Sequence, residues 1–214
     1  MAANSVDELM DLLHASRGAW DTPDRTGDPV DLHDHALQTA ALLRRRRPAD
    51  KELQIAGLVH DLGHLLRPGN DARHADVAAD AVRPLLGVRV ARLVQLHVPA
   101  KRYLAAVEPG RPLSGQSAAT LLLQGGPMTP AEAAAFARDP LAEDAVTLRQ
   151  ADDEGKAVGL DAGVMEDWRP VLESVAAATA RHLTETPYGV TASRSPGPSA
   201  SAGRPAGPRT PWEA

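Results

Sequence analysis

The sequence predicts an all-α protein, a bundle of helices closed around one core. Apolar residues recur at helical spacing in one segment after another, and no stretch of any length alternates as a β-strand does. Aromatic residues make up only 3% of the 214 residues, so Leu, Ala and Val have to fill the core, and these residues suit closely packed helices. A chain of this length can bury one core of good size, which predicts a single folded domain.

The first predicted helices are bounded by capping residues and by proline. Ser5, with Glu8 three residues later, reads as a capping box that starts a helix over Val6–Ala15. A loop rich in Gly, Pro and Asp is expected over residues 18–30. Helices over residues 32–47, ending at Pro48, and over residues 49–62 follow, and then a loop over residues 63–70.

The rest of the domain is also predicted to be helical, with breaks at glycine and proline. One helix should end at Gly87, and the next should be interrupted at Pro99. Thr129, with Pro130 and Glu132 after it, forms a second capping box. The expected helices cover residues 72–86, 88–98, 101–107, 114–123, 130–138, 140–158 and 165–184.

The last part of the chain has a different composition. From about residue 186 it consists mostly of Ser, Pro, Gly and Ala with a few Arg. Such a segment cannot bury enough apolar surface to offset the entropy lost on ordering, so we expect a helical domain over residues 1–185 and a disordered tail over residues 186–214.

Charge and cysteine content argue against several classes of protein. The formal net charge of −5 disfavours nucleic-acid binding, and the absence of cysteine excludes disulfides and thiolate metal sites. No apolar run approaches the roughly 20 residues that span a bilayer, and the acidic N-terminus does not resemble a signal peptide. We therefore expect a cytoplasmic protein with no nucleic-acid, membrane or obligate protein partner.

A candidate metal centre is built around two adjacent residues. His60 and Asp61 end an apolar segment, where an unpaired carboxylate would be costly. Adjacent helical residues point about 100° apart, so both can serve one cluster only if the metals lie near the helix end and the carboxylate bridges them. Ligands without sulfur suit iron, manganese, zinc or magnesium, and several carboxylates favour iron or manganese. The other candidates on the predicted helices are His35, His74, His97 and Asp152, with His64 one turn after His60.

The order His35, His60-Asp61, Asp152 resembles the H…HD…D signature of HD-domain proteins, most of which are phosphohydrolases. Longer stretches are similar to the HD-domain oxygenases that cleave phosphonates, and the resemblance covers residues 27–156. These stretches are HALQTA at 35–40, HDLGH at 60–64, LHVPAKRYL at 96–104, LLLQGGPM at 121–128 and DAVTLRQADDEGK at 144–156.

This resemblance implies an enzyme that uses iron and O2 as co-substrate to split the C–P bond of a 1-hydroxyphosphonate into phosphate and a carboxylic acid. It implies two iron ions of mixed valence, Fe(II) and Fe(III), in an HD-domain helical bundle with the metal site between helices. By position, one iron falls to His35, His60 and Asp152 and the second to His74 and His97, with Asp61 as the bridge. Asp61 and His64 are the expected catalytic residues.

The phosphonate carries about two negative charges and needs fixed donors. Lys101 and Arg149 each lie about one helical turn from a candidate metal ligand, and with Ser117 and Thr120 they match the phosphonate contacts that the resemblance implies. Judged from the residues alone, an exposed cation is an equally good interpretation of Lys101 and of Arg149.

One loop departs from the pattern of these oxygenases. Where they have Tyr-x-Gly-Glu, this chain has Arg25-Thr26-Gly27-Asp28. Arg25 cannot ligate iron, and Asp28 is shorter than the Glu that helps to select a substrate amino group. We therefore expect Arg25 and Asp28 to contact the substrate and to change its selection, with Arg25 facing a neutral or anionic group.

Two other functions remain open at this stage. A divalent-metal phosphohydrolase would use a metal-activated water on a phosphate ester, and the identity of the metal separates it from the oxygenase. A non-catalytic HD module that binds an anionic small molecule is the third candidate. The complete set of ligands counts against it, because a binding module need not keep six of them.

Overall fold

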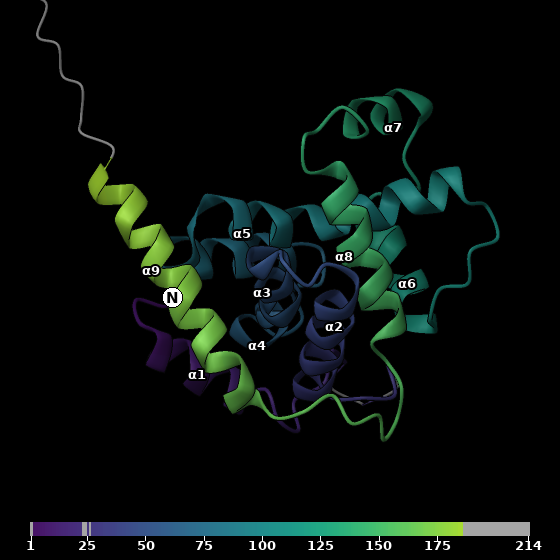
Figure 1. The fold of residues 1–214 in the computed structure, drawn as a ribbon. Helices are drawn as coiled ribbons and strands as arrows, with labels where there is room; N and C mark the ends of the chain where they lie inside the picture. Colours follow the sequence, from purple (N-terminus) through teal and green to yellow (C-terminus); the bar gives the residue numbers. More distant parts are fainter. Residues whose placement is uncertain (1, 23–24, 26, 186–214) are drawn as a thin grey trace, which may run out of the picture.

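The computed structural model describes residues 2–22, 25 and 27–185, and this part of the chain is all-α, as predicted (Figure 1). The tail over residues 186–214 lies outside the described residues, so its disorder stays a prediction. The elements are α1 (Val6–Ala15), α2 (Leu32–Arg46), α3 (Lys51–Val59), α4 (Leu62–Leu66), α5 (His74–Val107), α6 (Gly115–Leu123), α7 (Pro130–Phe136), α8 (Ala142–Glu154), a 3-10 turn η1 (Met165–Trp168) and α9 (Arg169–Glu185).

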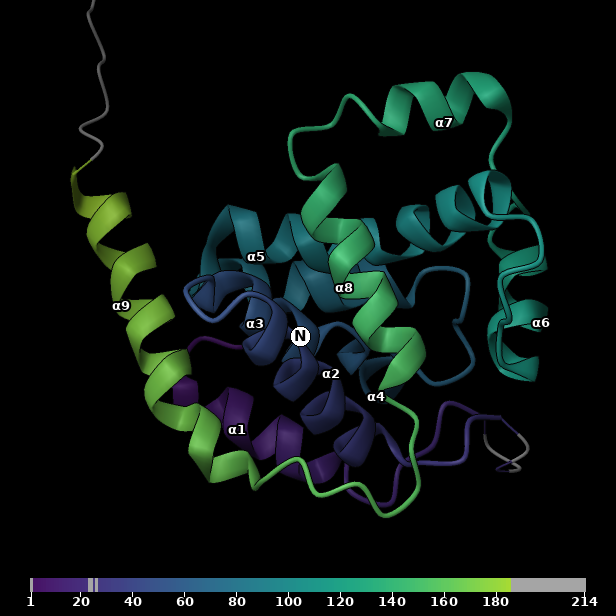
Figure 2. The ribbon, with the colours of Figure 1, turned by 45° about the vertical axis from the view of Figure 1, so that its right-hand side comes forward.

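Helices α2, α3, α5 and α8 form the central bundle, in which α5 packs on α3 and α8, and α2 packs on the same two. Helices α1 and α9 cover one side of this bundle, and α6 and α7 lie on the other side (Figure 2). No helix among the described residues is long and apolar enough to cross a membrane.

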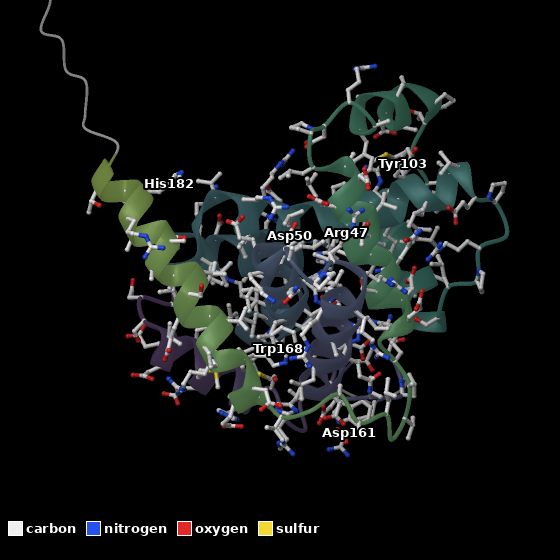
Figure 3. All side chains as sticks on the ribbon, in the orientation of Figure 1. Arg47, Asp50, Tyr103, Asp161, Trp168 and His182 are labelled. Carbon is white, nitrogen blue, oxygen red and sulfur yellow. The ribbon has the colours of Figure 1, made fainter. Side chains whose placement is uncertain are left out.

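The core consists mainly of Leu, Ala and Val, as the composition predicts. Its largest member is Trp168, which is fully buried and points into the core beside α9 (Figure 3). The guanidinium carbon of Arg44 on α2 lies 4.8 Å from the centre of the Trp168 ring. Trp168 therefore joins the C-terminal helix to the bundle that carries the candidate metal ligands.

Between α3 and α5 the structure corrects the prediction. The helix expected over residues 49–62 ends at Val59, and α4 replaces part of the expected loop. Asp61 has φ −100° and ψ 7°, so the helix is broken at the His60-Asp61 pair. The new helix packs very closely on α5, because a Cβ on Gly63 would lie 1.9 Å from the His74 carbonyl oxygen. Local sequence patterns cannot reveal so close an approach between two segments.

Helix α5 consists of two arms. Gly87, at φ 85° and ψ 178°, separates them where the sequence predicts a helix end. Pro99, however, does not interrupt the second arm. Proline inside a helix costs about 3 kcal/mol. This arm is held by the packing of Leu96 and Ala100 with Phe136 of α7 and Ala145 of α8.

The other boundaries differ by a few residues. The capping box at Thr129 is present, whereas Glu8 accepts a hydrogen bond from the Asn4 amide, 2.8 Å away, instead of completing a box with Ser5. Helix α7 ends at Phe136, and α8 covers Ala142–Glu154 where residues 140–158 were expected.

Candidate metal centre

Four buried histidines turn the same ring atom toward one space inside the bundle. In each of them Nδ1 lies 2.6–2.8 Å from a backbone carbonyl oxygen. Because a carbonyl only accepts, Nδ1 carries a proton in each ring, and Nε2 is the atom available to a metal. The four pairs are His35 with Gly155, His60 with Gly57, His74 with Asp71, and His97 with Val94.

His74 and His97 form the pair of histidines that most clearly indicates a metal site. Their Nε2 atoms lie 2.9 Å apart. Burial lowers the pKa of His74 to about 4, and burial together with His74 holds the pKa of His97 well below its usual value, so both rings are neutral at pH 7. Two lone pairs at this distance repel each other unless a cation lies between them. Donors at right angles around a metal with bonds of about 2.1 Å are about 3.0 Å apart, so this pair fits a metal ion.

His35 and His60 form the second pair, with Nε2 atoms 3.3 Å apart. Burial lowers the pKa of His35, but hydrogen bonds to Asp152 and Asp61 outweigh it and raise this pKa to about 10. A metal that binds this pair therefore has to displace a proton from His35, which makes its affinity depend on pH.

Asp61 presents one carboxylate oxygen to each pair. Its Oδ2 lies 3.4 Å from Nε2 of both His35 and His60, and its Oδ1 lies 3.4 Å from Nε2 of His74 and 3.7 Å from that of His97. The break in the helix at residue 61 lets the adjacent His60 and Asp61 serve one cluster. This is the arrangement of a carboxylate that bridges two metal ions.

Helix α8 brings a second carboxylate to the first pair. Asp152 Oδ1 lies 3.3 Å from His35 Nε2, while its Oδ2 accepts a hydrogen bond of 2.6 Å from Arg149. Burial by itself would raise the pKa of both carboxyl groups. The charge of His60 lowers the pKa of Asp61 well below its usual value, and the charges of Arg149 and Lys156 do the same for Asp152. Both carboxylates are therefore anionic, the form that a metal needs.

A small polar cavity of about 40 Å³ opens beside the candidate ligands. Its wall contains the predicted phosphonate contacts Lys101, Ser117, Thr120 and Arg149. The whole lining consists of Asp21, Asp28, Asp61, His64, His74, His97, Lys101, Gln116, Ser117, Thr120, Arg149, Asp152 and Lys156.

The cations of this wall are joined to the hydroxyls of α6. Lys101 Nζ donates to Thr120 Oγ1 at 2.9 Å, and Arg149 donates to Ser117 Oγ at 3.1 Å. Burial and the charge of Arg149 lower the pKa of Lys101 to about 8. Cations and hydroxyls that converge in this way can hold an anion with several oxygens.

His64 also lies in the wall, against the candidate ligands. Its ring stacks on that of His74 with centroids 4.2 Å apart, and its Nε2 lies 3.9 Å from Asp61 Oδ1. Burial lowers the pKa of His64, but Asp71, whose Oδ1 lies 3.3 Å from His64 Nδ1, raises it above the usual value.

The structure separates the two residues of the divergent loop. Asp28 lines the cavity, and its Oδ2 lies 2.6 Å from Lys156 Nζ. Arg25 is exposed, has φ 58°, and its guanidinium carbon lies 5.5 Å from the centre of the Trp20 ring. Arg25 is not part of the cavity wall, in contrast to our expectation, because its guanidinium remains in water on an aromatic face.

Sequence reasoning missed three residues of the wall: Asp21, Gln116 and Lys156. Lys156 could have been found, since it ends the DAVTLRQADDEGK stretch one turn after Asp152. Asp21 lies in a loop without periodicity, and Gln116 was one of several polar residues in its segment, so neither offered a signal.

Comparisons with known proteins agree with this site. Residues 32–153 match the HD domain family, and the chain therefore belongs to that family. It is 38% identical over 152 residues to a protein of Gimesia maris named hydroxymethylphosphonate dioxygenase, a match that covers 66% of this chain and 75% of the relative. It is 29% identical over 157 residues to a protein of Leisingera caerulea named 1-hydroxy-2-(trimethylamino)ethyl phosphonate dioxygenase (glycine-betaine-forming), covering 69% and 80%.

Within the HD-domain family the chain is thus an oxygenase, in the group of these two named dioxygenases. Neither relative is named as a phosphohydrolase, so that alternative is not favoured. The clusters of His and Asp side chains are consistent with the use of metal and O2.

Proposed function

We propose that this protein uses two iron ions and O2 to cleave the C–P bond of a small 1-hydroxyphosphonate. For hydroxymethylphosphonate the products are formate and phosphate. The C–P bond and one C–H bond break, and carbon and phosphorus each gain one oxygen atom. One proton is released, so a single molecule of O2 balances the reaction.

The observation that carries this proposal is the position of the anion-binding wall directly beside the candidate metal ligands. Lys101, Arg149 and the Ser117 hydroxyl supply donors for the three phosphonate oxygens. Thr120, which donates to the Gln116 carbonyl, accepts from Lys101 and positions it. These side chains are all buried, so they bind an anion in a site with little water, where charge interactions are stronger.

The size of the cavity favours a small substrate. The cavity has a volume of about 40 Å³, so a substrate with a bulky tail would require the wall to move. Hydroxymethylphosphonate, for which the Gimesia maris relative is named, is the smallest member of its class. It is therefore the substrate that we would test first.

Different residues of this chain would bind the metal ions, orient the substrate and accept its proton. His35, His60, Asp61, His74, His97 and Asp152 would hold the two metal ions, iron in a mixed-valent state, which would supply O2 activation. Lys101 and Arg149 orient the phosphonate so that its carbon faces the ligand cluster. We assign to His64, whose Nδ1 faces Asp71 and whose Nε2 faces Asp61, the role of taking the proton of the substrate hydroxyl.

The experiment is turnover of hydroxymethylphosphonate by protein purified without oxygen and loaded with iron. We expect about two irons per chain, a mixed-valent electron paramagnetic resonance signal that the phosphonate perturbs, and equal amounts of formate and phosphate only after O2 is admitted. With isotopically labelled O2, one labelled atom should enter each product. Release of phosphate without O2, or from a phosphate ester with manganese or magnesium, would reject the proposal in favour of hydrolysis.

A further inference from the structure

We infer that Lys156 sets substrate specificity, by neutralising Asp28 and so excluding substrates with a cationic tail. This inference rests on the proposed function and refines it. The two relatives are named for different substrates. One is named for hydroxymethylphosphonate, which has no further substituent on its carbon, and the other for a phosphonate with a trimethylamino group at the end of its carbon chain. The residues that line the cavity have to decide between such substrates.

Asp28 is the obvious acidic group for holding a cationic tail. Its side chain is mostly buried in the cavity wall, and Asp21, a second carboxylate, lies beside it, with the Asp28 amide 3.4 Å from Asp21 Oδ2. Among the described residues, Asp28 Oδ1 has no hydrogen-bond partner. Left unpaired, this pair of carboxylates would attract an ammonium group.

Lys156 weakens that attraction, because it pairs with one of the two carboxylates. Its Nζ lies 2.6 Å from Asp28 Oδ2, and its side chain is only 11% exposed, so water screens this ion pair little. Two strongly paired buried charges leave little net field for a third. A substrate tail that carries an ammonium would have to compete with Lys156 for Asp28.

The same ammonium also faces the phosphonate side of the cavity. Lys156 Nζ lies 3.3 Å from Ser117 Oγ and 3.8 Å from Asp152 Oδ1. The ammonium donates a hydrogen bond to Ser117, and its contact with Asp152 is a longer ion pair. Lys156 thus adds positive charge on the side where the phosphonate group would bind. It also reduces the negative charge of Asp28, on the side where a substrate tail would lie.

The test compares two ligands of equal size and different charge on iron-loaded protein. These are 1-hydroxypropylphosphonate, with a neutral tail, and 2-amino-1-hydroxyethylphosphonate, in which an ammonium replaces the terminal methyl group. The ratio of their dissociation constants, measured by calorimetry without oxygen, isolates the effect of the tail charge. We expect the wild type to prefer the neutral ligand.

Two substitutions should shift this ratio in opposite directions. Lys156→Met frees Asp28 and should move the ratio toward the cationic ligand by about tenfold, the scale of one close charge pair. Asp28→Asn leaves Lys156 unneutralised and should move the ratio about tenfold the other way. The double variant should return to within about threefold of the wild type, because the two effects belong to one pair. Opposite shifts cannot come from general damage to the fold.

Lys51→Met is the matched control, since Lys51 is exposed at the start of α3 and donates to the Pro48 carbonyl. It should leave the ratio unchanged. The inference fails if both variants move the ratio in one direction or by less than about threefold. It also fails if the wild type binds neither ligand.

Turnover of hydroxymethylphosphonate separates this inference from the proposed function. Formation of formate and phosphate with an unmoved ligand ratio would reject only the role of Lys156. Opposite shifts of the ratio in a protein that does not consume O2 would reject only the reaction.

Discussion

His74 and His97 lie 23 residues apart on α5, yet their Nε2 atoms are separated by 2.9 Å. In a straight helix the rise of 1.5 Å per residue would separate them by about 35 Å. The two arms of α5 must therefore fold back on each other, and Gly87 is the residue at which the chain reverses. Half of the candidate metal centre depends on this one glycine.

Substitution of Gly87 should consequently damage both stability and metal binding. Its φ of 85° and ψ of 178° fall in a region that only glycine adopts readily, and a Cβ would lie 2.8 Å from Thr179 Oγ1. We expect Gly87→Ala to lower the free energy of unfolding by about 2–4 kcal/mol and to weaken binding of the second metal. Gly115→Ala is the control, since that glycine has no atom within 4 Å of its Cβ position. Urea unfolding and metal analysis would show the difference, and equal behaviour of the two variants would contradict the argument.

Metal binding should stabilise the fold, because the ion removes the repulsion between the two neutral rings. A metal present at about a hundredfold excess over its Kd contributes about 2.7 kcal/mol, or about 5–10 °C in Tm for a domain of this size. We expect chelation to lower the Tm by that amount. His97→Ala should retain about one metal per chain in place of two. A chelated protein with an unchanged Tm would show that the cluster does not hold metal.

The activity should depend on the charge of Lys101. Since burial lowers the pKa of this group to about 8, the ammonium is charged below that pH and loses its proton above it. We therefore expect kcat/KM for hydroxymethylphosphonate to fall above about pH 8, by up to tenfold per unit. Lys101→Arg should move this decline out of the measurable range, because arginine stays protonated. An identical decline in both proteins would assign it to another group.

Trp168 should matter for stability more than for chemistry. It is fully buried in the core, its ring contacts Arg44, and it is not among the residues that line the cavity. Trp168→Ala should cost about 3–5 kcal/mol of the free energy of unfolding, through lost burial and a cavity. Leu183→Ala, at a residue that is 71% exposed, should change it by less than about 0.5 kcal/mol. Urea titrations followed by circular dichroism would measure both.

Arg25 should have little influence on the substrate, because its guanidinium lies on Trp20 and outside the cavity wall. We expect Arg25→Ala to leave kcat/KM nearly unchanged, because a side chain that does not contact the transition state does not lower its energy. A larger change, or an altered preference among hydroxyphosphonates, would show that Arg25 moves to the substrate on binding.

The sequence by itself determined the helical class and the chemical type of the candidate metal ligands, and with the family motifs it predicted most residues of the cavity wall. Helical periodicity, caps at residues such as Thr129 and the break at Gly87 are local features, so they can be deduced without tertiary contacts. Ligand chemistry is likewise a property of residue type. The family motifs matched His35, His60-Asp61 and Asp152 to the H…HD…D signature. They could therefore group residues that lie on separate helices.

Only the tertiary structure decided which side chains meet. The proximity of His74 to His97 depends on the reversal of α5, and the pairing of Asp28 with Lys156 joins a loop to the end of α8 across 128 residues. Arg25 and Asp28 are separated by two residues, yet one faces water and the other the cavity. A loop has no periodicity that could predict this, because its side-chain directions follow from individual backbone angles and from the surfaces on which it packs.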